Sequence, residues 1–132
     1  MPPPPTAPTP VTGGLRLVLV EDNDDVRETL GDYLRLCGHT VEVAEDGRGG
    51  VDLVLGTMPD VAFIDIGLPS MDGYEVAAEI RARAPGAPVR LIALTGYGRP
   101  EDRKRALDAG FNAHLVKPVA PEDLDQIART PS

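Results

Sequence analysis

Hydrophobic residues in this chain lie in two kinds of segment that alternate along the sequence. Short, nearly uninterrupted apolar runs end in clusters of Gly, Pro, Asp, Asn or Ser, which is typical of strands buried on both faces. The longer segments between them repeat apolar residues every three or four positions, which predicts amphipathic helices. The predicted strands are 15–20, 41–44, a central run from 61 to 65, 89–94 and 113–116.

The boundaries of the predicted helices come from residues that commonly start or stop a helix. Asp22, Asn23 and Asp24 are N-cap candidates for the first helix, and Gly38 fits the left-handed position at its end. The second helix is weak, because the Gly-Gly pair at its start costs roughly 1 kcal/mol per glycine relative to alanine. A Met-Pro pair closes it at 58–59. The remaining helices are predicted at 74–84, 100–109 and 121–129.

Strand and helix alternate five times within a chain of 132 residues. Strands connected by helices lie parallel in one sheet, with helices on both faces. The fold class is therefore α/β, a doubly wound parallel sheet, in one domain that we place at residues 15–129. Residues 1–14 contain six prolines in the first ten positions and predict a disordered tail or linker, and 130–132 form a C-terminal tail.

Composition narrows the range of partners. The chain has 21 acidic and 13 basic residues and a formal net charge of −8, which argues against a nucleic-acid or anionic-membrane partner.

The single cysteine, Cys37, has no partner for an internal disulfide and is predicted to be a core thiol, which fits a reducing compartment. No apolar run approaches the ~20 residues of a membrane span, and no leader opens the chain. We therefore expect a soluble, cytoplasmic protein.

The central strand carries one carboxylate, Asp65, directly before a Gly/Pro/Ser/Asp/Gly turn cluster. An aspartate buried without a partner would cost several kcal/mol, so this residue must be paired, bound to a metal, or at the open edge of a site. In open α/β sheets, ligands bind at the carboxyl ends of the strands, where Asp65 lies. We interpret Asp65 as a nucleophile that accepts a phosphoryl group.

Other polar residues follow the neighbouring strands: Glu21 and Asp22 after the first, Thr95 after the fourth and Lys117 after the fifth. In a parallel sheet these ends face the same edge, so the side chains are expected to converge with Asp65. Clustered carboxylates repel one another, and Mg²⁺ resolves that repulsion while leaving positions for water and phosphate oxygens. Positioning and electrostatics supply most of what phosphoryl transfer requires.

Four motifs carry a family resemblance: VLVEDN (18–23), DIGLPSMDG (65–73), ALTGYG (93–98) and HLVKPV (114–119). In this order and spacing the chain resembles the receiver domain of two-component response regulators, from residue 15 to about 129. The amino-acid sequences of several of these motifs resemble those in the receiver domains of hybrid histidine kinases. The resemblance implies a flavodoxin-like fold with strand order 2-1-3-4-5.

The same resemblance implies roles for the site residues. Asp65 would be the phosphoacceptor and Asp22 a direct Mg²⁺ ligand, with Glu21 acting largely through water and the main-chain carbonyl of Gly67 completing the protein ligands. Thr95 and Lys117 would bind phosphoryl oxygens, and the Lys117-Pro118 peptide would be cis. The chain would be a signalling switch and not an enzyme in the ordinary sense.

The resemblance also implies a switch and partners. Thr95 would move toward the phosphoryl group, and His114, where the family usually has an aromatic residue, would turn inward or else remain a static, partly buried ring. The phosphodonor would be a histidine kinase or a histidine phosphotransfer protein. A weak dimer could form through the face made by 100–109, 113–116 and 121–129.

Three alternatives stay open for these residues. A phosphatase of the haloacid-dehalogenase type would need a second acid where Gly67 stands, and a flavodoxin-like FMN carrier would need a phosphate loop where Glu21 and Asp22 stand. A protein that keeps the fold without being phosphorylated is the third alternative. The simpler roles are a helix cap for Asp22, a strand end for Thr95 and a surface cation for Lys117. Two further side chains are predicted to lie outside the chemistry, namely His39 as an exposed loop residue and Leu107 as an inward-facing helix residue.

Overall fold

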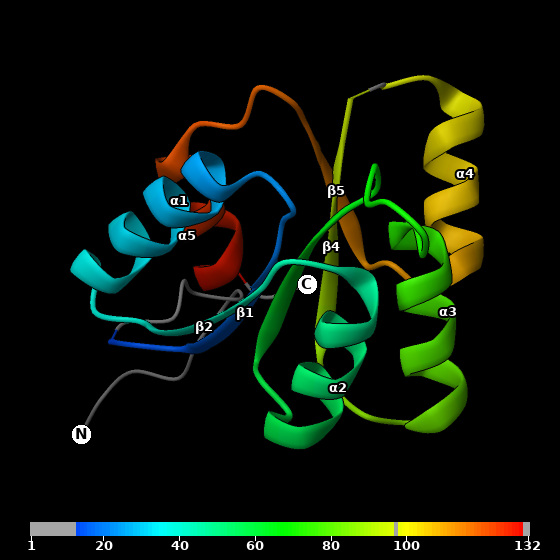
Figure 1. Ribbon diagram of the computed structural model, residues 1–132, viewed down its shortest axis with the longest axis horizontal. Helices are drawn as coiled ribbons and strands as arrows, with labels where there is room; N and C mark the ends of the chain where they lie inside the picture. Colours follow the sequence, from blue (N-terminus) through cyan, green and yellow to red (C-terminus); the bar gives the residue numbers. More distant parts are fainter. Residues whose placement is uncertain (1–12, 97, 131–132) are drawn as a thin grey trace, which may run out of the picture.

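The computed structural model describes residues 13–96 and 98–130, and in them strands and helices alternate along the chain (Figure 1). The predicted tail therefore lies largely outside the described residues. The elements are β1 (Arg16–Val20), α1 (Asp24–Leu36), β2 (Thr40–Ala44), α2 (Gly47–Thr57), β3 (Val61–Asp65), α3 (Gly73–Arg83), β4 (Arg90–Thr95), α4 (Pro100–Ala109), β5 (Ala113–Val116) and α5 (Pro121–Arg129).

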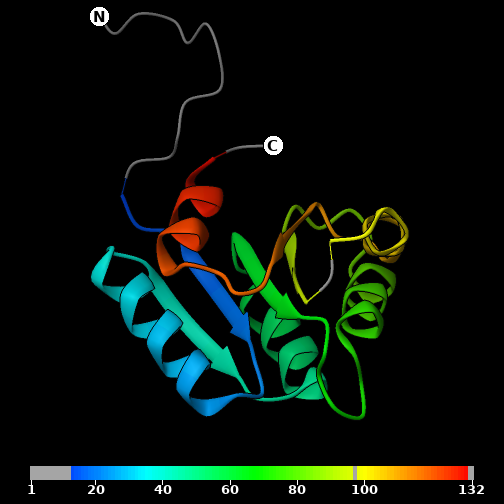
Figure 2. The ribbon, with the colours of Figure 1, turned by 90° about the horizontal axis from the view of Figure 1, so that it is seen from above.

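The strands form one parallel sheet in the order β2-β1-β3-β4-β5, which confirms the predicted fold class and strand order. Figure 2 shows α1 and α5 on one face of the sheet and α2, α3 and α4 on the other. The central strand β3 lies between β1 and β4 and is buried at every position, because both of its faces are covered by helices.

Alternate residues of the strands feed two separate hydrophobic cores, as the two-residue period of a strand requires. On β1, Leu17 and Leu19 face α1 and α5 and pack in a core with Phe63 of β3. Val18 and Val20 face the opposite side, in the core formed with α2, α3 and α4. The strands are thus held firmly from both faces, and the position of their carboxyl ends is fixed.

The helix ends explain two features of the sequence. Asn23 caps α1 by accepting a hydrogen bond from the Val26 N–H at 3.0 Å, so the neighbouring Asp22 does not serve as the cap. The second glycine of the pair in α2 has a packing reason, because a Cβ on Gly50 would lie 2.7 Å from the side chain of Val20. At position 50 the weak helix signal therefore reflects the close approach of α2 to β1.

Three residues differ from the sequence predictions. The prediction for Leu107 is wrong: this side chain is 63% exposed, because α4 turns Ala106 toward the core and the next residue lies well around the helix. Cys37 is partly exposed and is therefore not a core thiol. The prediction for His39 is also wrong, since the residue is only 5% exposed.

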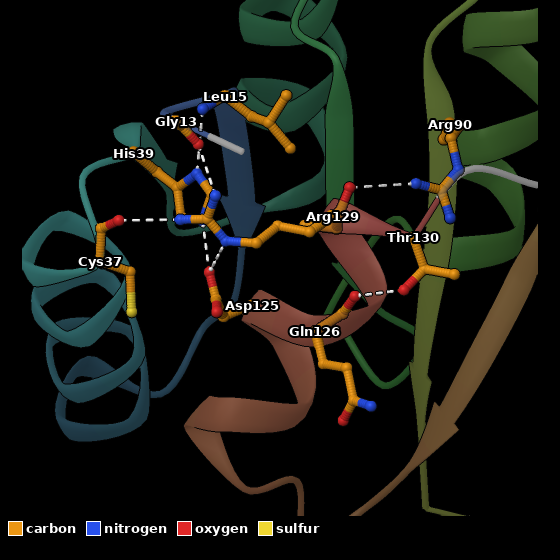
Figure 3. Close-up of polar contacts among 10 residues, drawn as sticks. Gly13, Leu15, Cys37, His39, Arg90, Asp125, Gln126, Arg129 and Thr130 are labelled. Atoms are coloured by element: carbon orange, nitrogen blue, oxygen red, sulfur yellow. Dashed lines mark hydrogen bonds and ion pairs between the residues drawn. The ribbon is translucent and has the colours of Figure 1, made fainter. Parts of the chain in front are cut away.

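His39 is buried because both of its ring nitrogens have partners (Figure 3). Nδ1 accepts a hydrogen bond from the Leu15 N–H at 3.0 Å, and Nε2 lies 2.6 Å from Oδ1 of Asp125 on α5. Arg129 donates from Nε to the same carboxylate at 2.8 Å and from its terminal nitrogens to the carbonyls of Gly13 and Cys37. This cluster ties α5 to the segments before β1 and β2, at the amino ends of the strands.

Candidate functional site

The carboxyl ends of four strands meet at the opposite edge of the sheet. Asp65 is the last residue of β3 and Thr95 the last of β4, while Glu21 directly follows β1 and Lys117 directly follows β5. Asp65, Thr95 and Lys117 line one pocket of about 540 Å³. The structure therefore brings these residues together as parallel strands predict, although their chemical roles stay predictions.

Three carboxylates form the acidic side of this site. Glu21, Asp22 and Asp65 each offer an oxygen, and these oxygens all lie within 4.8 Å of one another. Glu21 and Asp65 are 2% and 5% exposed, whereas Asp22 is exposed to solvent. The oxygen donors, their charge and the open position beside Asp22 fit a hard divalent cation such as Mg²⁺, which keeps several waters.

Lys117 lies against the same carboxylates. Its Nζ is 3.0 Å from Oδ2 of Asp65 and 3.5 Å from Oε2 of Glu21. Burial, and then the charge of Asp65, raise the pKa of Glu21 to about 6, although Lys117 opposes the shift. Burial alone would lower the pKa of Lys117, but the hydrogen bond and charge of Asp65 and the charge of Glu21 outweigh it, so the net shift is upward. The lysine stays cationic beside Asp65.

Backbone groups orient the two buried carboxylates. Oδ1 of Asp65 accepts a hydrogen bond from the Gly67 N–H at 3.0 Å, and Oε1 of Glu21 accepts one from the Asn23 N–H at 3.2 Å. Each carboxylate thus has one oxygen held by the main chain, while the other lies toward Lys117. The family resemblance implies that the main-chain carbonyl of Gly67 is a metal ligand. The structure shows in addition that the Gly67 N–H orients the carboxylate of Asp65.

Thr95 and Lys117 are held together by the edge of the sheet. The Lys117 N–H donates to the Thr95 carbonyl at 2.7 Å, and Thr95 is 6% exposed. The Lys117-Pro118 peptide is cis, as the family resemblance implies. Both residues therefore belong to the structure of the pocket, in addition to any role toward a phosphoryl group.

His114 lies outside the pocket that contains Asp65. It lines a separate hollow of about 260 Å³ between α4 and β5, where its Nε2 is 3.4 Å from Nε of Arg103. The ring is partly buried in this position. Its movement on activation stays a prediction.

Three polar residues that line the pocket were not predicted as site residues from the sequence: Tyr74, Asp102 and Arg105. Tyr74 lies in the first turn of α3, and the other two lie one helical turn apart on α4. They reach the site because α3 packs beside α4. None of them belongs to a motif with a recognised spacing, and no signal in the sequence could have placed them there.

A parallel sheet of order β2-β1-β3-β4-β5 that gathers three carboxylates, a threonine and a lysine at one edge is characteristic of receiver-type signalling proteins. The comparison with protein families agrees with this class, since the family described as response regulator receiver domain matches residues 17–129. The chain belongs to this family, the receiver domains of two-component systems.

Curated relatives include proteins of very different lengths. Response regulator MprA of Mycolicibacterium vanbaalenii is 36% identical over 83% of this chain, which spans 47% of that protein. The gliding motility regulatory protein of Myxococcus xanthus is 34% identical over 86% of the chain, which spans only 14% of that protein. An uncharacterized 14.6 kDa protein of Leptolyngbya boryana is 35% identical, with 86% of each chain covered. The chain thus spans about half or less of the two longer relatives.

Solved structures give the same result. The receiver domain of the sensor histidine kinase PA1611 of Pseudomonas aeruginosa is 35% identical, with a TM-score of 0.78, and covers 88% of this chain and 95% of its own. The chemotaxis protein CheY4 of Vibrio cholerae is 27% identical, with a TM-score of 0.80, and covers 88% of this chain and 98% of its own.

Among the helices that the structure describes, none has the length and apolar character of a membrane span.

Proposed function

We propose that this chain is a phosphoaccepting receiver. It takes a phosphoryl group from the phosphohistidine of a histidine kinase or phosphotransfer protein onto Asp65, with Mg²⁺, and signals by a conformational change. The observation that carries the proposal is the buried carboxylate of Asp65, which lies 3.0 Å from the Lys117 ammonium and beside two further carboxylates. Residues 15–129 form the receiver, and the protein acts in the cytoplasm.

The chemistry is a direct displacement at phosphorus. An oxygen of Asp65 forms the new O–P bond while the P–N bond to the donor imidazole breaks, and the electron pair of that bond stays on the nitrogen. Lys117 and the Thr95 hydroxyl donate hydrogen bonds to the phosphoryl oxygens as charge develops on them. Lys117 lies 3.0 Å from Asp65 before the donor arrives, whereas Thr95 would move toward the phosphoryl group as part of the switch.

Glu21, Asp22, Asp65 and the main-chain carbonyl of Gly67 would hold Mg²⁺. When bound, the ion neutralises the carboxylates and the charge of the phosphoryl oxygens. The receiver domain of PA1611 from Pseudomonas aeruginosa has a magnesium ion coordinated in its active-site cleft. The acidic cluster of this chain has the oxygen donors that such an ion requires.

The alternatives are less well supported by the site. Gly67 cannot transfer a proton, so the second acid of a haloacid-dehalogenase-type phosphatase is missing from that position. An FMN phosphate would meet Glu21 and Asp22 after β1, where a flavodoxin-like carrier needs neutral donors.

The output switch would use Thr95 and His114, and the face formed by α4, β5 and α5 would be the surface for a weak dimer or for a partner.

The test is labelling of Asp65 with a small phosphodonor. Wild type incubated with acetyl phosphate and Mg²⁺ should gain one phosphoryl group that hydroxylamine removes, as mass spectrometry of the intact protein can detect. Asp65→Asn should gain none, while Asp52→Asn, a matched change at an exposed residue of α2, should label normally. Equal labelling of wild type and Asp65→Asn would refute the assignment.

A further inference from the structure

One wall of the pocket is formed by residues that the proposed phosphoacceptor chemistry does not use. Tyr74 of α3 and Asp102 and Arg105 of α4 line the same cavity as Asp65 and Lys117. They bring one positive and one negative charge to the cavity that contains Asp65. Their arrangement therefore bears on how the anionic donor is bound.

Arg105 is a cation held in place by an aromatic ring. Its guanidinium carbon lies 4.1 Å from the centroid of the Tyr74 ring, within the range of a cation–π contact. Among the described residues it makes no salt bridge, in contrast to Lys104, which lies 3.5 Å from Asp108 on the same helix. Stacking occupies the planar face of a guanidinium and leaves its N–H edge free to donate to an anion.

Asp102 lies one turn before Arg105 and opposes it. Its Oδ2 is buried and has no hydrogen-bond partner in the part of the chain that the structure describes. Burial raises the pKa of Tyr74, Asp102 raises it further, and Arg105 lowers it, so both charges act on the ring between them. A carboxylate in the wall repels an incoming anion, whereas the guanidinium attracts it.

We propose that Arg105 is an anion-binding residue for the incoming phosphodonor, presented to the pocket by Tyr74 and opposed by Asp102. This inference rests on the proposed phosphorylation of Asp65 and deepens it. With acetyl phosphate, an Asp65 oxygen forms the O–P bond, the P–O bond to acetate breaks, and acetate leaves with the electron pair. Arg105 donates hydrogen bonds to the phosphate oxygens and transfers no proton. The two charges thereby set the donor concentration at which Asp65 reacts.

The experiment measures the initial rate of Asp65 phosphorylation against acetyl phosphate concentration, at low ionic strength and saturating Mg²⁺. Arg105→Gln should raise the half-saturating concentration by about threefold to fivefold, the size expected for a solvent-exposed ion pair, and leave the maximal rate nearly unchanged. Asp102→Asn should change the half-saturating concentration in the opposite direction. High salt should reduce both effects, because mobile ions screen charges near the surface.

Matched variants separate charge from packing. Lys104→Gln removes the same charge from an exposed part of α4 outside the pocket and should leave the half-saturating concentration unchanged. Tyr74→Leu removes the stacking contact and should resemble Arg105→Gln, whereas Tyr74→Phe, which keeps the ring, should give a value between those of wild type and Tyr74→Leu. Arg105→Lys keeps the charge but loses the planar fork, and an intermediate value is expected.

The inference is overturned if Arg105→Gln and Lys104→Gln give the same half-saturating concentration. A lower maximal rate with unchanged half-saturation would also overturn it, since that pattern indicates a structural role for the residue. Failure of the proposed function is distinguishable from either result, because wild type would then take up no phosphoryl group at all and the inference would fall with it.

Discussion

Glu21 is the residue of the acidic cluster at which the cost of ionisation can be tested. Its carboxyl is 2% exposed, and burial together with the charge of Asp65 raises its pKa from the ordinary value of 4.5 to about 6. The pKa is higher in the folded protein than in the unfolded chain, so ionisation of Glu21 destabilises the fold. Stability that is fully present below pH 4.5 is lost as the pH rises through about 6.

The magnitude follows from the size of this shift. A rise from 4.5 to about 6 corresponds to about 2 kcal/mol, at 1.36 kcal/mol for each pH unit. Glu21→Gln replaces the carboxyl with a neutral group of the same shape and removes the cost of ionisation. At pH 7.5 and without divalent cations, the variant should therefore unfold with a free energy up to about 2 kcal/mol greater than that of wild type. At pH 4 the two proteins should be nearly equal.

The assay is urea unfolding of both proteins at the two pH values in the presence of EDTA, because comparison at each pH cancels effects common to both proteins. Glu28→Gln, at an exposed residue of α1, is the matched control and should change stability little at either pH. The reasoning is refuted if Glu21→Gln is no more stable than wild type at pH 7.5. It is also refuted if the gain is as large at pH 4, since the effect would then not come from ionisation.

Two further predictions concern the cation and the cluster at the other edge of the sheet. Mg²⁺ at ten times its dissociation constant should raise the free energy of unfolding by about 1.4 kcal/mol, and Asp22→Ala should lose most of this gain; a melting temperature indifferent to millimolar Mg²⁺ would contradict the proposed site. Burial alone would raise the pKa of Asp125, but hydrogen bonds from His39 and Arg129 lower it below its ordinary value of 3.8. Stability from this carboxylate is therefore present above pH 3.8 and lost as the pH falls further, so Asp125→Asn should be less sensitive to acid in urea unfolding between pH 2 and 5. Equal acid sensitivity of variant and wild type would show that the depressed pKa has no part in stability.

The sequence by itself determined the strands, the parallel sheet and the meeting of the site residues. Strand patterns are local, because a buried strand needs an apolar run and its end needs turn residues, as at Val61–Asp65. Convergence of Asp65, Thr95 and Lys117 follows from connectivity, since parallel strands place their carboxyl ends at the same edge. Neither inference requires knowledge of which side chains touch.

Only the tertiary structure decided which side chains became partners across the chain. His39 follows a helix stop and has the sequence context of an exposed loop residue, yet it is buried because it bonds to residues 24 and 86 positions away. Arg105 reaches the pocket because α3 and α4 pack together, and Leu107 is exposed because Ala106 makes that contact. Periodicity specifies the face of an element, whereas the neighbour that covers it depends on the packing of segments distant in sequence.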